Sequence, residues 1–417
     1  MKVRTGGEHM RWLKILIPVT LVLLLLLPGC VSAEQAEELT PGCSVSVVDN
    51  RGGAGNLTDG KYSTWWNSTE RKDPWVVIAS DRPVYSLYVC FTDLPESYVI
   101  QEQSGEDWTT VAESGKTGFY HAFFELNGQQ AIRILSASQD KSVIGISEIH
   151  VFGKGSVPDW VQRWEPPAEK ADILFFVAHP DDEILFFGGA IPTYAAEKGK
   201  SVQIAYLTDS RTFRRSEALN GLWAMGVRHY PEFGWVVDKY PITDKVSDGY
   251  LYAGGEDKVL AWVTWLFRKY RPEVVVTLAE NGEYGHPQHK MTADSAEKCF
   301  EMAADASCYP ESAAQYGVWQ VKKLYHHQYG DEEREQTVFD WDQPLAAFGG
   351  KTGAEIAEEA FALHVSQQGA GIRRRGKFEI FTVKKFGVEF YPYNRYVLYS
   401  TTVGKDTEKN DFLEHIE

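Results

Sequence analysis

The feature that most constrains this fold is an alternation of short, wholly apolar runs with helical patterns, which begins near residue 171. Strands that are apolar along their whole length must be buried on both faces, and strands that alternate with helices pair in parallel. The predicted strands span residues 171–178, 201–208 and 273–279, and the predicted helices span residues 184–197, 214–225, 257–270 and 289–304. The sequence therefore predicts an α/β sandwich whose functional groups gather at the carboxyl ends of parallel strands.

An all-β pattern precedes this region, from residue 40 to residue 153. Short alternating or apolar runs are separated there by clusters of Gly, Asp, Asn and Ser, which is the rhythm of a β-sandwich. Residues 154–170 contain several Pro and charged residues and are typical of a linker. The predicted architecture is multidomain: an all-β jelly-roll sandwich at 40–153, an α/β sandwich with a mainly parallel, Rossmann-like sheet at 171–400, and a C-terminal tail at 401–417.

Residues 1–33 resemble an export segment. Basic residues precede an apolar run at 15–27, which is short for a membrane span but suits the core of a signal. The run ends in Leu-Pro-Gly-Cys, which resembles a bacterial lipobox and makes Cys30 the predicted lipidation site. Cleavage after Ala33 is the alternative and would release a soluble protein. We expect an extracellular protein in either case, a lipoprotein anchored to the bacterial cell membrane or a secreted one.

Charge and cysteine content limit the partners. The 58 acidic and 42 basic residues give a net charge of −16, which repels phosphate backbones, so no nucleic-acid partner is expected. Four cysteines follow the export segment, Cys43 and Cys90 in the first domain and Cys299 and Cys308 in the second. A disulfide is possible within each pair, and the spacing leaves the connectivity open.

Two polar clusters follow predicted strands. Residues 178–183, Ala-His-Pro-Asp-Asp-Glu, come directly after the first strand, and residues 281–289 follow the strand that ends at residue 279. One imidazole and three carboxyl groups this close together are costly unless a cation neutralises them. Imidazole and carboxylate ligands favour zinc (Zn²⁺) or a similar transition ion over calcium or magnesium. Three protein ligands would leave one position open for water, as a catalytic zinc site requires.

Four motifs in the same order carry a resemblance to a known family. Ala-His-Pro-Asp-Asp-Glu at 178–183 and Gly-His-Pro-Gln-His at 285–289 resemble the two signatures of the PIG-L/LmbE-like de-N-acetylase family. The Arg-x-x-Glu segment at 214–217 and the His-x-Ser-Gln segment at 364–367 resemble two further motifs of that family. Its members act on N-acetylglucosamine attached to inositol compounds and on related acylated amino sugars. The resemblance extends over about residues 171–400.

The resemblance implies a role for each matched residue. His179, Asp182 and His289 are the implied zinc ligands, and Asp181 is the implied general base for the attacking water. His286 would stabilise the developing oxyanion or protonate the departing amine.

The resemblance implies roles for three further residues. Tyr284 corresponds to a tyrosine that in some relatives polarises the amide carbonyl, Arg214 to a sugar-contacting arginine, and Asp238 to a sugar-binding aspartate. Glu183 is expected to orient a metal ligand through a hydrogen bond.

Gln288 departs from the family pattern, which usually has Asp at this position. A carboxylate can both orient and charge a neighbouring histidine, whereas an amide can only orient it. We therefore expect position 288 to bear on the protonation state of His286.

The first domain carries a second resemblance. Leu-Thr-Asp-Gly, Ser-Thr-Trp-Trp and Ile-Ser-Glu-Ile-His-Val-Phe-Gly, between residues 57 and 153, resemble a discoidin-like (galactose-binding-like) domain, which implies carbohydrate binding. Trp65, Trp66 and Trp108 are candidate platforms for stacking a sugar, but core packing is the alternative and is favoured for Trp66. No binding residue is assigned in this domain.

The sequence thus predicts a zinc-dependent hydrolase that removes an N-acetyl group from an amino sugar. An N-acetylglucosamine-containing extracellular glycoconjugate is the expected substrate, with a glycan as the possible ligand of the β-sandwich. A catalytically inactive carbohydrate-binding surface protein is the first alternative, and a zinc amidase on a non-sugar substrate is the second. Presence of every catalytic residue of the family argues against the first, because a pure binder needs no general base.

Overall fold

The computed structural model describes residues 34–49, 53–114, 118–209, 212–240, 243–328, 335–374, 377–380, 382–383 and 394–416. The export segment and the lipidation site at Cys30 lie outside these residues and stay predictions. Within the described ranges, no helix is long and apolar enough to cross a membrane. The described residues from Gln35 onward belong to one compact unit, Gln35–Glu417.

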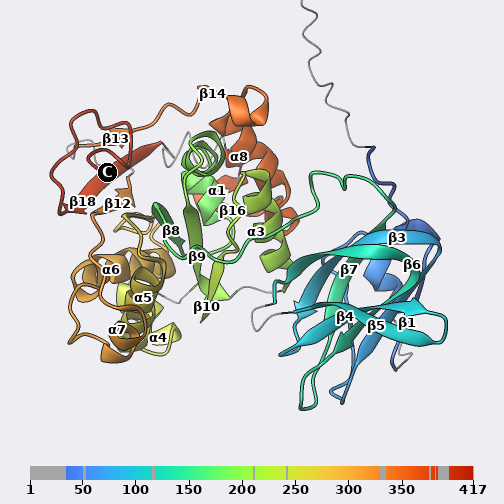
Figure 1. The fold of residues 1–417 in the computed structure, drawn as a ribbon. Helices are drawn as coiled ribbons and strands as arrows, with labels where there is room; N and C mark the ends of the chain where they lie inside the picture. The colour runs from blue at the N-terminus through green and yellow to red at the C-terminus, as the bar shows by residue number, and fades with distance from the viewer. Residues whose placement is uncertain are drawn as a thin grey trace, which may run out of the picture. The chain divides into compact units, whose positions relative to one another are not determined.

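The amino-terminal region forms an antiparallel β-sheet (Figure 1). Its seven strands lie in the order β2-β7-β3-β6-β4-β5, with β1 paired to β3. The strands are β1 (Ser44–Val47), β2 (Trp66–Asn67), β3 (Trp75–Asp93), β4 (Tyr98–Ser104), β5 (Asp107–Glu113), β6 (His121–Ser136) and β7 (Gly145–Phe152). Two short 3₁₀ turns, η1 (Thr40–Gly42) and η2 (Ala54–Thr58), accompany them. The predicted all-β character is confirmed, and the jelly-roll path stays a prediction.

Two long strands organise this sheet. β3 joins two runs that the sequence presents as separate, residues 75–78 and 85–91, and β6 likewise joins the runs at 120–126 and 131–135. The register between the two strands shifts between Ala79 and Ser86, which marks a bulged, bending stretch. Turn-like residues inside a bulge therefore look like a chain reversal in the sequence.

The second region contains a seven-stranded sheet in the order β10-β9-β8-β11-β12-β18-β13. Its strands are β8 (Ile173–Val177), β9 (Val202–Asp209), β10 (Glu232–Val237), β11 (Val274–Thr277), β12 (Lys323–His327), β13 (Thr337–Val338) and β18 (Arg395–Thr401). All pairs from β10 to β12 are parallel, and β18 and β13 add an antiparallel edge. The predicted mainly parallel sheet is confirmed, whereas the comparison with a Rossmann fold stays a prediction.

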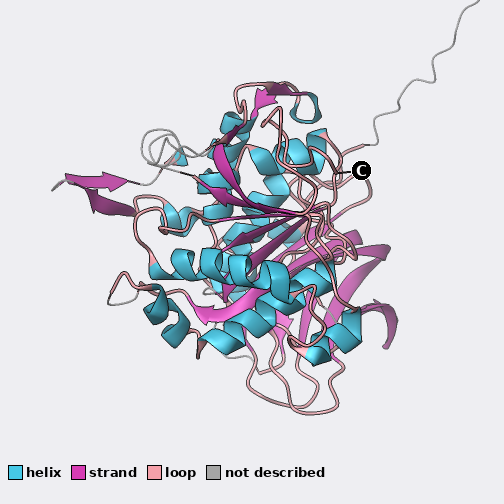
Figure 2. Ribbon diagram, turned by 90° about the vertical axis from the view of Figure 1, so that its left-hand side faces the viewer, coloured by secondary structure: helices cyan, strands magenta, loops and turns pink. Residues whose placement is uncertain are grey.

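Helices cover both faces of this sheet (Figures 1 and 2). They are α1 (Asp182–Phe187), α2 (Ala190–Pro192), α3 (Thr212–Ala224), α4 (Val246–Tyr252), α5 (Glu256–Tyr270), α6 (Pro287–Met302), α7 (Pro310–Tyr316) and α8 (Gly353–Ala362). Along β8, Ile173 and Phe175 pack into a core with α1, α3 and α8, while Leu174 and Phe176 pack into a second core with α5 and α6. Burial on both faces is the physical reason that β8 is apolar at every position.

The predicted helix at residues 184–197 is the one that differs most from its prediction. It is divided into α1, α2 and a π-helical turn, η3 (Thr193–Glu197). The division lies at Gly188 and Gly189, where a Cβ added to Gly189 would meet the ring of Trp341 at 1.9 Å. Close approach to Trp341 thus requires a glycine at the point where the helix is interrupted.

Two small hairpins and several buried side chains lie outside the two main sheets. Two small hairpins pair β14 (Pro344–Leu345) with β15 (Lys351–Thr352) and β16 (Gly371–Arg374) with β17 (Lys377–Ile380). Between the two main sheets in sequence, Val161 and Trp164 are buried, and after β18 the ring of Phe412 is fully buried. Cys43, Cys90, Cys299 and Cys308 are all free thiols, so neither possible disulfide is present.

Candidate functional site

Two loops leave the same edge of the parallel sheet. β8 ends at Val177 and is followed by the loop that contains His179, and β11 ends at Thr277 and leads to α6. The two strands pair directly, with Thr277 opposite Phe176. Because neighbouring parallel strands end together, both polar clusters are delivered to one place.

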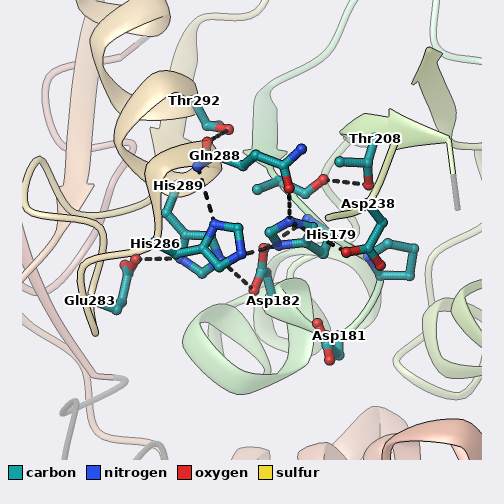
Figure 3. A network of polar contacts seen from close by, with 12 residues as sticks. His179, Asp181, Asp182, Thr208, Asp238, Glu283, His286, Gln288, His289 and Thr292 are labelled. Carbon is teal, nitrogen blue, oxygen red and sulfur yellow. Dashed lines mark hydrogen bonds and ion pairs between the residues drawn. The ribbon is translucent and has the colours of Figure 1, made fainter. Parts of the chain in front are cut away.

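The side chains of three residues at these strand ends converge (Figure 3). His179 Nδ1 lies 3.2 Å from His289 Nε2. Asp182 reaches both rings, with Oδ2 at 3.3 Å from His179 Nδ1 and Oδ1 at 3.3 Å from His289 Nε2. All three residues are buried. The structure therefore brings together the same three residues that the sequence predicts as metal ligands.

The outward-facing nitrogens of the two rings determine where their hydrogens lie. His289 Nδ1 is 2.7 Å from Glu283 Oε2, and His179 Nε2 is 2.7 Å from Gln288 Oε1. Both oxygens only accept hydrogen bonds, so a neutral imidazole in either place carries its hydrogen on that outward nitrogen. His179 Nδ1 and His289 Nε2 then face each other with lone pairs, beside a carboxylate.

This arrangement fits a divalent metal ion. Ligand atoms at about 2.0–2.1 Å from a tetrahedral ion lie about 3.3–3.4 Å from one another. The distances found among the side chains of His179, Asp182 and His289 are close to this value. Without an ion, two lone pairs and a carboxylate attract a proton instead. Burial alone would lower the pKa of His289, but Asp182 and Glu283 outweigh it and raise that pKa to about 10. The site is thus built to stabilise positive charge.

His286, unlike His289, is held in its neutral form. Its Nδ1 accepts a hydrogen bond of 3.1 Å from the backbone N–H of Gln288, at the start of α6. Burial, and then the neighbouring His179 and His289, lower its pKa far below the usual range, which keeps the ring neutral. A neutral ring that accepts at Nδ1 carries its hydrogen on Nε2. Although ring nitrogens of all three histidines lie within 4.8 Å of one another, His286 is therefore a hydrogen-bond donor in this state.

Asp181 lies beside the ligand atoms in a constrained backbone. It is buried and has a φ of 131°, which is unusual for a residue with a side chain and costs about 1–3 kcal/mol. Its backbone N–H donates to Glu183 Oε2 at 2.8 Å, and its Oδ2 is 3.2 Å from Arg214 Nη2. Burial raises the pKa of Asp181 to about 7, with Arg214 opposing and Asp182 adding to the rise. The carboxyl group is thus poised to exchange a proton near neutral pH.

Two buried glutamates hold parts of the site in place, and Glu183 does so differently from its expected role. Glu183 holds the backbone of Asp181, not a metal ligand, and its Oε1 faces His364 Nε2 at 3.5 Å. Glu283, to which sequence analysis assigns no role, orients His289 and also accepts from His327 Nδ1 at 2.9 Å. The one sequence feature that points to this role is that Glu283 comes six residues before His289.

Arg214 and Asp238 border a cavity of about 410 Å³ beside Asp181. Arg214 forms an ion pair with Asp238 through Nη1 and donates to the carbonyl oxygen of Pro180 through Nη2. Asp238 Oδ1 lies 3.8 Å from His179 Nε2. The cavity is lined by Asp209, Phe213, Arg214, Val237, Asp238, Ser366 and Gln367. Its wall offers both donors and acceptors, as a hydroxylated ligand requires.

The Arg-x-x-Glu and His-x-Ser-Gln segments meet at this cavity. Glu217 accepts from the backbone N–H of Ser366 at 2.7 Å and from its hydroxyl at 2.6 Å. With its amide nitrogen toward Asp181, Gln367 donates to Asp181 Oδ2 at 3.1 Å and accepts from Arg214 Nε at 3.2 Å. Gln367 is thus a further contact of Asp181 that no single motif reveals.

Two tyrosine rings pack against the histidines of the site. The ring of Tyr284 lies edge-on to His286 and His289, with centroids 5.7 and 5.2 Å away, and burial raises the pKa of its hydroxyl well above the usual range. Tyr240, which sequence analysis did not select, has its ring centroid 4.6 Å from that of His286.

The expectation for Gln288 is corrected by these contacts. Only its backbone N–H reaches His286, whereas its side chain bonds His179. Residues two apart at a helix start point in different directions, so proximity in sequence named the wrong histidine.

The candidate sugar platforms of the first domain differ in exposure. Trp66 is only 3% exposed and packs in the core of the sheet, as its alternative interpretation held, and Trp65 is 45% exposed. Arg133 covers the ring of Trp108, with its guanidinium carbon 4.3 Å from the centroid. Trp65 is therefore the one of the three with a largely open ring.

Residues 174–300 match the family model described as PIG-L: GlcNAc-PI de-N-acetylase. Over 186 residues the chain is 31% identical to 1D-myo-inositol 2-acetamido-2-deoxy-alpha-D-glucopyranoside deacetylase 1 of Catenulispora acidiphila, covering 38% of this chain and 56% of that protein. The chain thus spans little more than half the length of the curated relatives it matches first.

Two solved structures are distant neighbours. The N,N'-diacetylchitobiose deacetylase of Pyrococcus horikoshii has a TM-score of 0.36 at 17% identity, over 49% of this chain and 74% of that one. CpGH89CBM32-6 of Clostridium perfringens has a TM-score of 0.25 at 20% identity, over 28% of this chain and 100% of that one.

Proposed function

We propose that this protein is a zinc-dependent N-deacetylase that hydrolyses the acetamido group of an amino sugar. The observation that carries the proposal is the convergence of His179 Nδ1, His289 Nε2 and an Asp182 carboxylate at 3.2–3.3 Å, with Asp181 beside them. The family match over residues 174–300 and the relatives named as deacetylases support it.

Zinc is the ion that this set of atoms favours. Two imidazole nitrogens and one carboxylate suit zinc or a related transition ion, whereas calcium and magnesium prefer shells of oxygen. When bound, a zinc ion lowers the pKa of a coordinated water to about 7 and polarises a carbonyl group. His179, Asp182 and His289 would hold it, with Glu283 and Gln288 fixing the two rings.

Asp181 acts as the general base in this proposal. Its carboxylate takes a proton from the attacking water, a contribution of about 10²–10⁴-fold for a well-placed base. The raised pKa of about 7 makes the same group a competent acid afterwards. Glu183, Arg214 and Gln367 keep it in place through its backbone and its Oδ2.

His286 supports the developing oxyanion as a neutral donor. Nδ1 is engaged with the backbone N–H of Gln288, so the ring offers a hydrogen at Nε2 and has none to spare for the leaving amine. The departing nitrogen therefore receives its proton from Asp181, which took it from water, and the sum of the two transfers is hydrolysis of the amide. Of the two roles that the resemblance implies for His286, oxyanion stabilisation is the one we propose.

The amino sugar occupies the cavity beside Asp181. Arg214 and Asp238 present a donor and an acceptor there, and about 410 Å³ is within the usual range of ligand pockets. The predicted export segment favours an extracellular glycoconjugate as the source of that sugar. The first domain would add a glycan-binding surface at the exposed ring of Trp65.

Acetate release by the full-length protein tests the proposal. Metal-loaded protein is incubated with N-acetylglucosamine-containing glycans, before and after treatment with a chelator. We expect acetate release that stops on metal removal and returns with zinc. Glycan binding without acetate release would favour an inactive carbohydrate-binding protein. Hydrolysis of acylated amines without a sugar, and of no glycan, would favour an amidase with another substrate.

A further inference from the structure

Gln288 lies between a candidate metal ligand and the loop that borders the sugar cavity (Figure 3). Its side chain is fully buried. Oε1 accepts from His179 Nε2 at 2.7 Å, and Nε2 donates to the carbonyl oxygen of Val237 at 2.8 Å. The backbone N–H of Lys239 also approaches Oε1, at 3.4 Å. One amide group thus contacts both the metal centre and the segment after β10.

The side-chain amide of Gln288 satisfies both neighbours. His179 Nε2 needs an acceptor if its Nδ1 is to offer a lone pair, and the Val237 carbonyl needs a donor. A carboxylate would serve His179 but would set an oxygen against the carbonyl of Val237. An aliphatic side chain would serve neither.

The segment held by Gln288 also contributes groups to the site. Asp238 pairs with Arg214 at the cavity, and Asp238 Oδ1 is the nearest carboxylate oxygen to His179 Nε2 that we find among the described residues, at 3.8 Å. Tyr240 contacts His286 and is 56% exposed. A shift of residues 237–240 would therefore change the cavity wall and the surroundings of two histidines together.

We propose that Gln288 is a positioning residue that couples metal binding to the substrate loop. Its amide oxygen holds the His179 ring with Nδ1 toward the metal, and its amide hydrogen holds residues 237–240 against the same ring. The substrate side of this inference rests on the proposed function, whereas the metal side stands without it. Coupling of this kind is reciprocal, so a change that orders the loop also tightens metal binding.

Three variants of the full-length protein separate the two contacts. Gln288→Glu keeps an acceptor for His179 and loses the donor to Val237. Gln288→Leu loses both. Thr292→Val is the matched control, because the Thr292 hydroxyl bonds the backbone oxygen of Gln288 one turn along α6 and is equally buried.

Two readouts need no catalytic activity. The first is the zinc dissociation constant by competition with a chelator, and the second is hydrogen–deuterium exchange of peptides that contain residues 237–240. Gln288→Leu should bind zinc about 10–100-fold more weakly, the usual effect of removing a partner of a metal-bound histidine. Gln288→Glu should bind zinc at least as tightly as the natural protein. Both should exchange faster at 237–240, and Thr292→Val should match the natural protein in both readouts.

Kinetics add a third readout if acetate is released. Gln288→Glu, with zinc bound, should raise KM for the sugar more than it lowers kcat, because the loop and not the metal is perturbed. Zinc affinity of Gln288→Leu within twofold of the natural value would overturn the contact with His179. Unchanged exchange at 237–240 in Gln288→Glu would overturn the contact with the loop, and this variant also decides the matter if Gln288→Leu does not fold. Lack of activity in the natural protein would count against the proposed function alone.

Discussion

Replacing Glu283 with Gln should weaken metal binding without removing a metal ligand. Glu283 is buried, and one of its oxygens, Oε1, accepts from the backbone N–H of Ala279 at 2.8 Å and from His327 Nδ1 at 2.9 Å. The other, Oε2, faces His289 Nδ1 at 2.7 Å. Gln has almost the same shape but only one acceptor oxygen. We expect that oxygen to face the two donors, the backbone N–H of Ala279 and His327 Nδ1. The amide NH₂ group is then left against His289 Nδ1.

The consequence reaches the metal through the tautomer of His289. An NH₂ group at Nδ1 requires a lone pair there, so the ring must carry its hydrogen on Nε2, the atom that would bind the ion. The change also removes a charge that helps to raise the pKa of His289. Loss of such a partner typically costs about 10–100-fold in metal affinity, or about 1.4–2.7 kcal/mol.

Glu183→Gln is the control for this prediction. Glu183 is also buried near the site, in the first turn of α1, but its Oε2 accepts from the backbone of Asp181. The Glu183→Gln variant should therefore keep the zinc affinity of the natural protein and lose turnover. Both variants are titrated with a chelator of known affinity in the full-length protein. Equal zinc affinity of Glu283→Gln and the natural protein would refute the reasoning about the tautomer.

Three other predictions concern the base, its neighbour and the helix break. Asp181→Asn should retain zinc and thermal stability but lose about 10²–10⁴-fold in kcat; turnover near the natural value would remove Asp181 from the mechanism. Arg214→Met should move the acidic limb of the kcat/KM profile to higher pH, because a base works deprotonated and Arg214 holds the pKa of Asp181 down from a value already near 7; an unmoved or lowered limb would contradict this. Gly189→Ala should lower stability to denaturant by about 1–3 kcal/mol, since the added Cβ overlaps the Trp341 ring, whereas Gly55→Ala has open space and serves as control; equal effects of the two would exclude the clash.

The sequence predicts the parallel sheet and the placing of two loops because those features follow from local patterns. Burial of β8 on both faces makes it apolar throughout, so both the strand and the loop with His179 that follows it can be predicted from the sequence. The break at Gly189 cannot be predicted in this way, because it depends on Trp341, which lies far along the chain. The sequence presents each of the long strands β3 and β6 as two separate runs for a similar reason, since a bulge and a turn use the same residue types.

Partners of the histidines were harder to predict than the histidines themselves. Glu283 has a φ of 53°, and the turn of which it is part brings its carboxylate back to His289. Such a reversal is not visible in spacing. Gln288 was linked to the wrong ring because its backbone and its side chain reach different histidines. Gln367 reaches Asp181 only because Glu217 anchors Ser366 beside it, which joins segments about 150 residues apart.

X-ray absorption at the zinc edge, on metal-loaded full-length protein, tests the central claim most directly. It reports the number and kind of atoms around the ion and distinguishes imidazole rings by their outer scattering. We predict nitrogen and oxygen ligands at about 2.0–2.1 Å, with no sulfur and with two imidazoles, from His179 and His289, beside the Asp182 carboxylate. Three imidazoles would make His286 a ligand and contradict its role as a neutral donor, and a protein that binds no zinc would contradict the account as a whole.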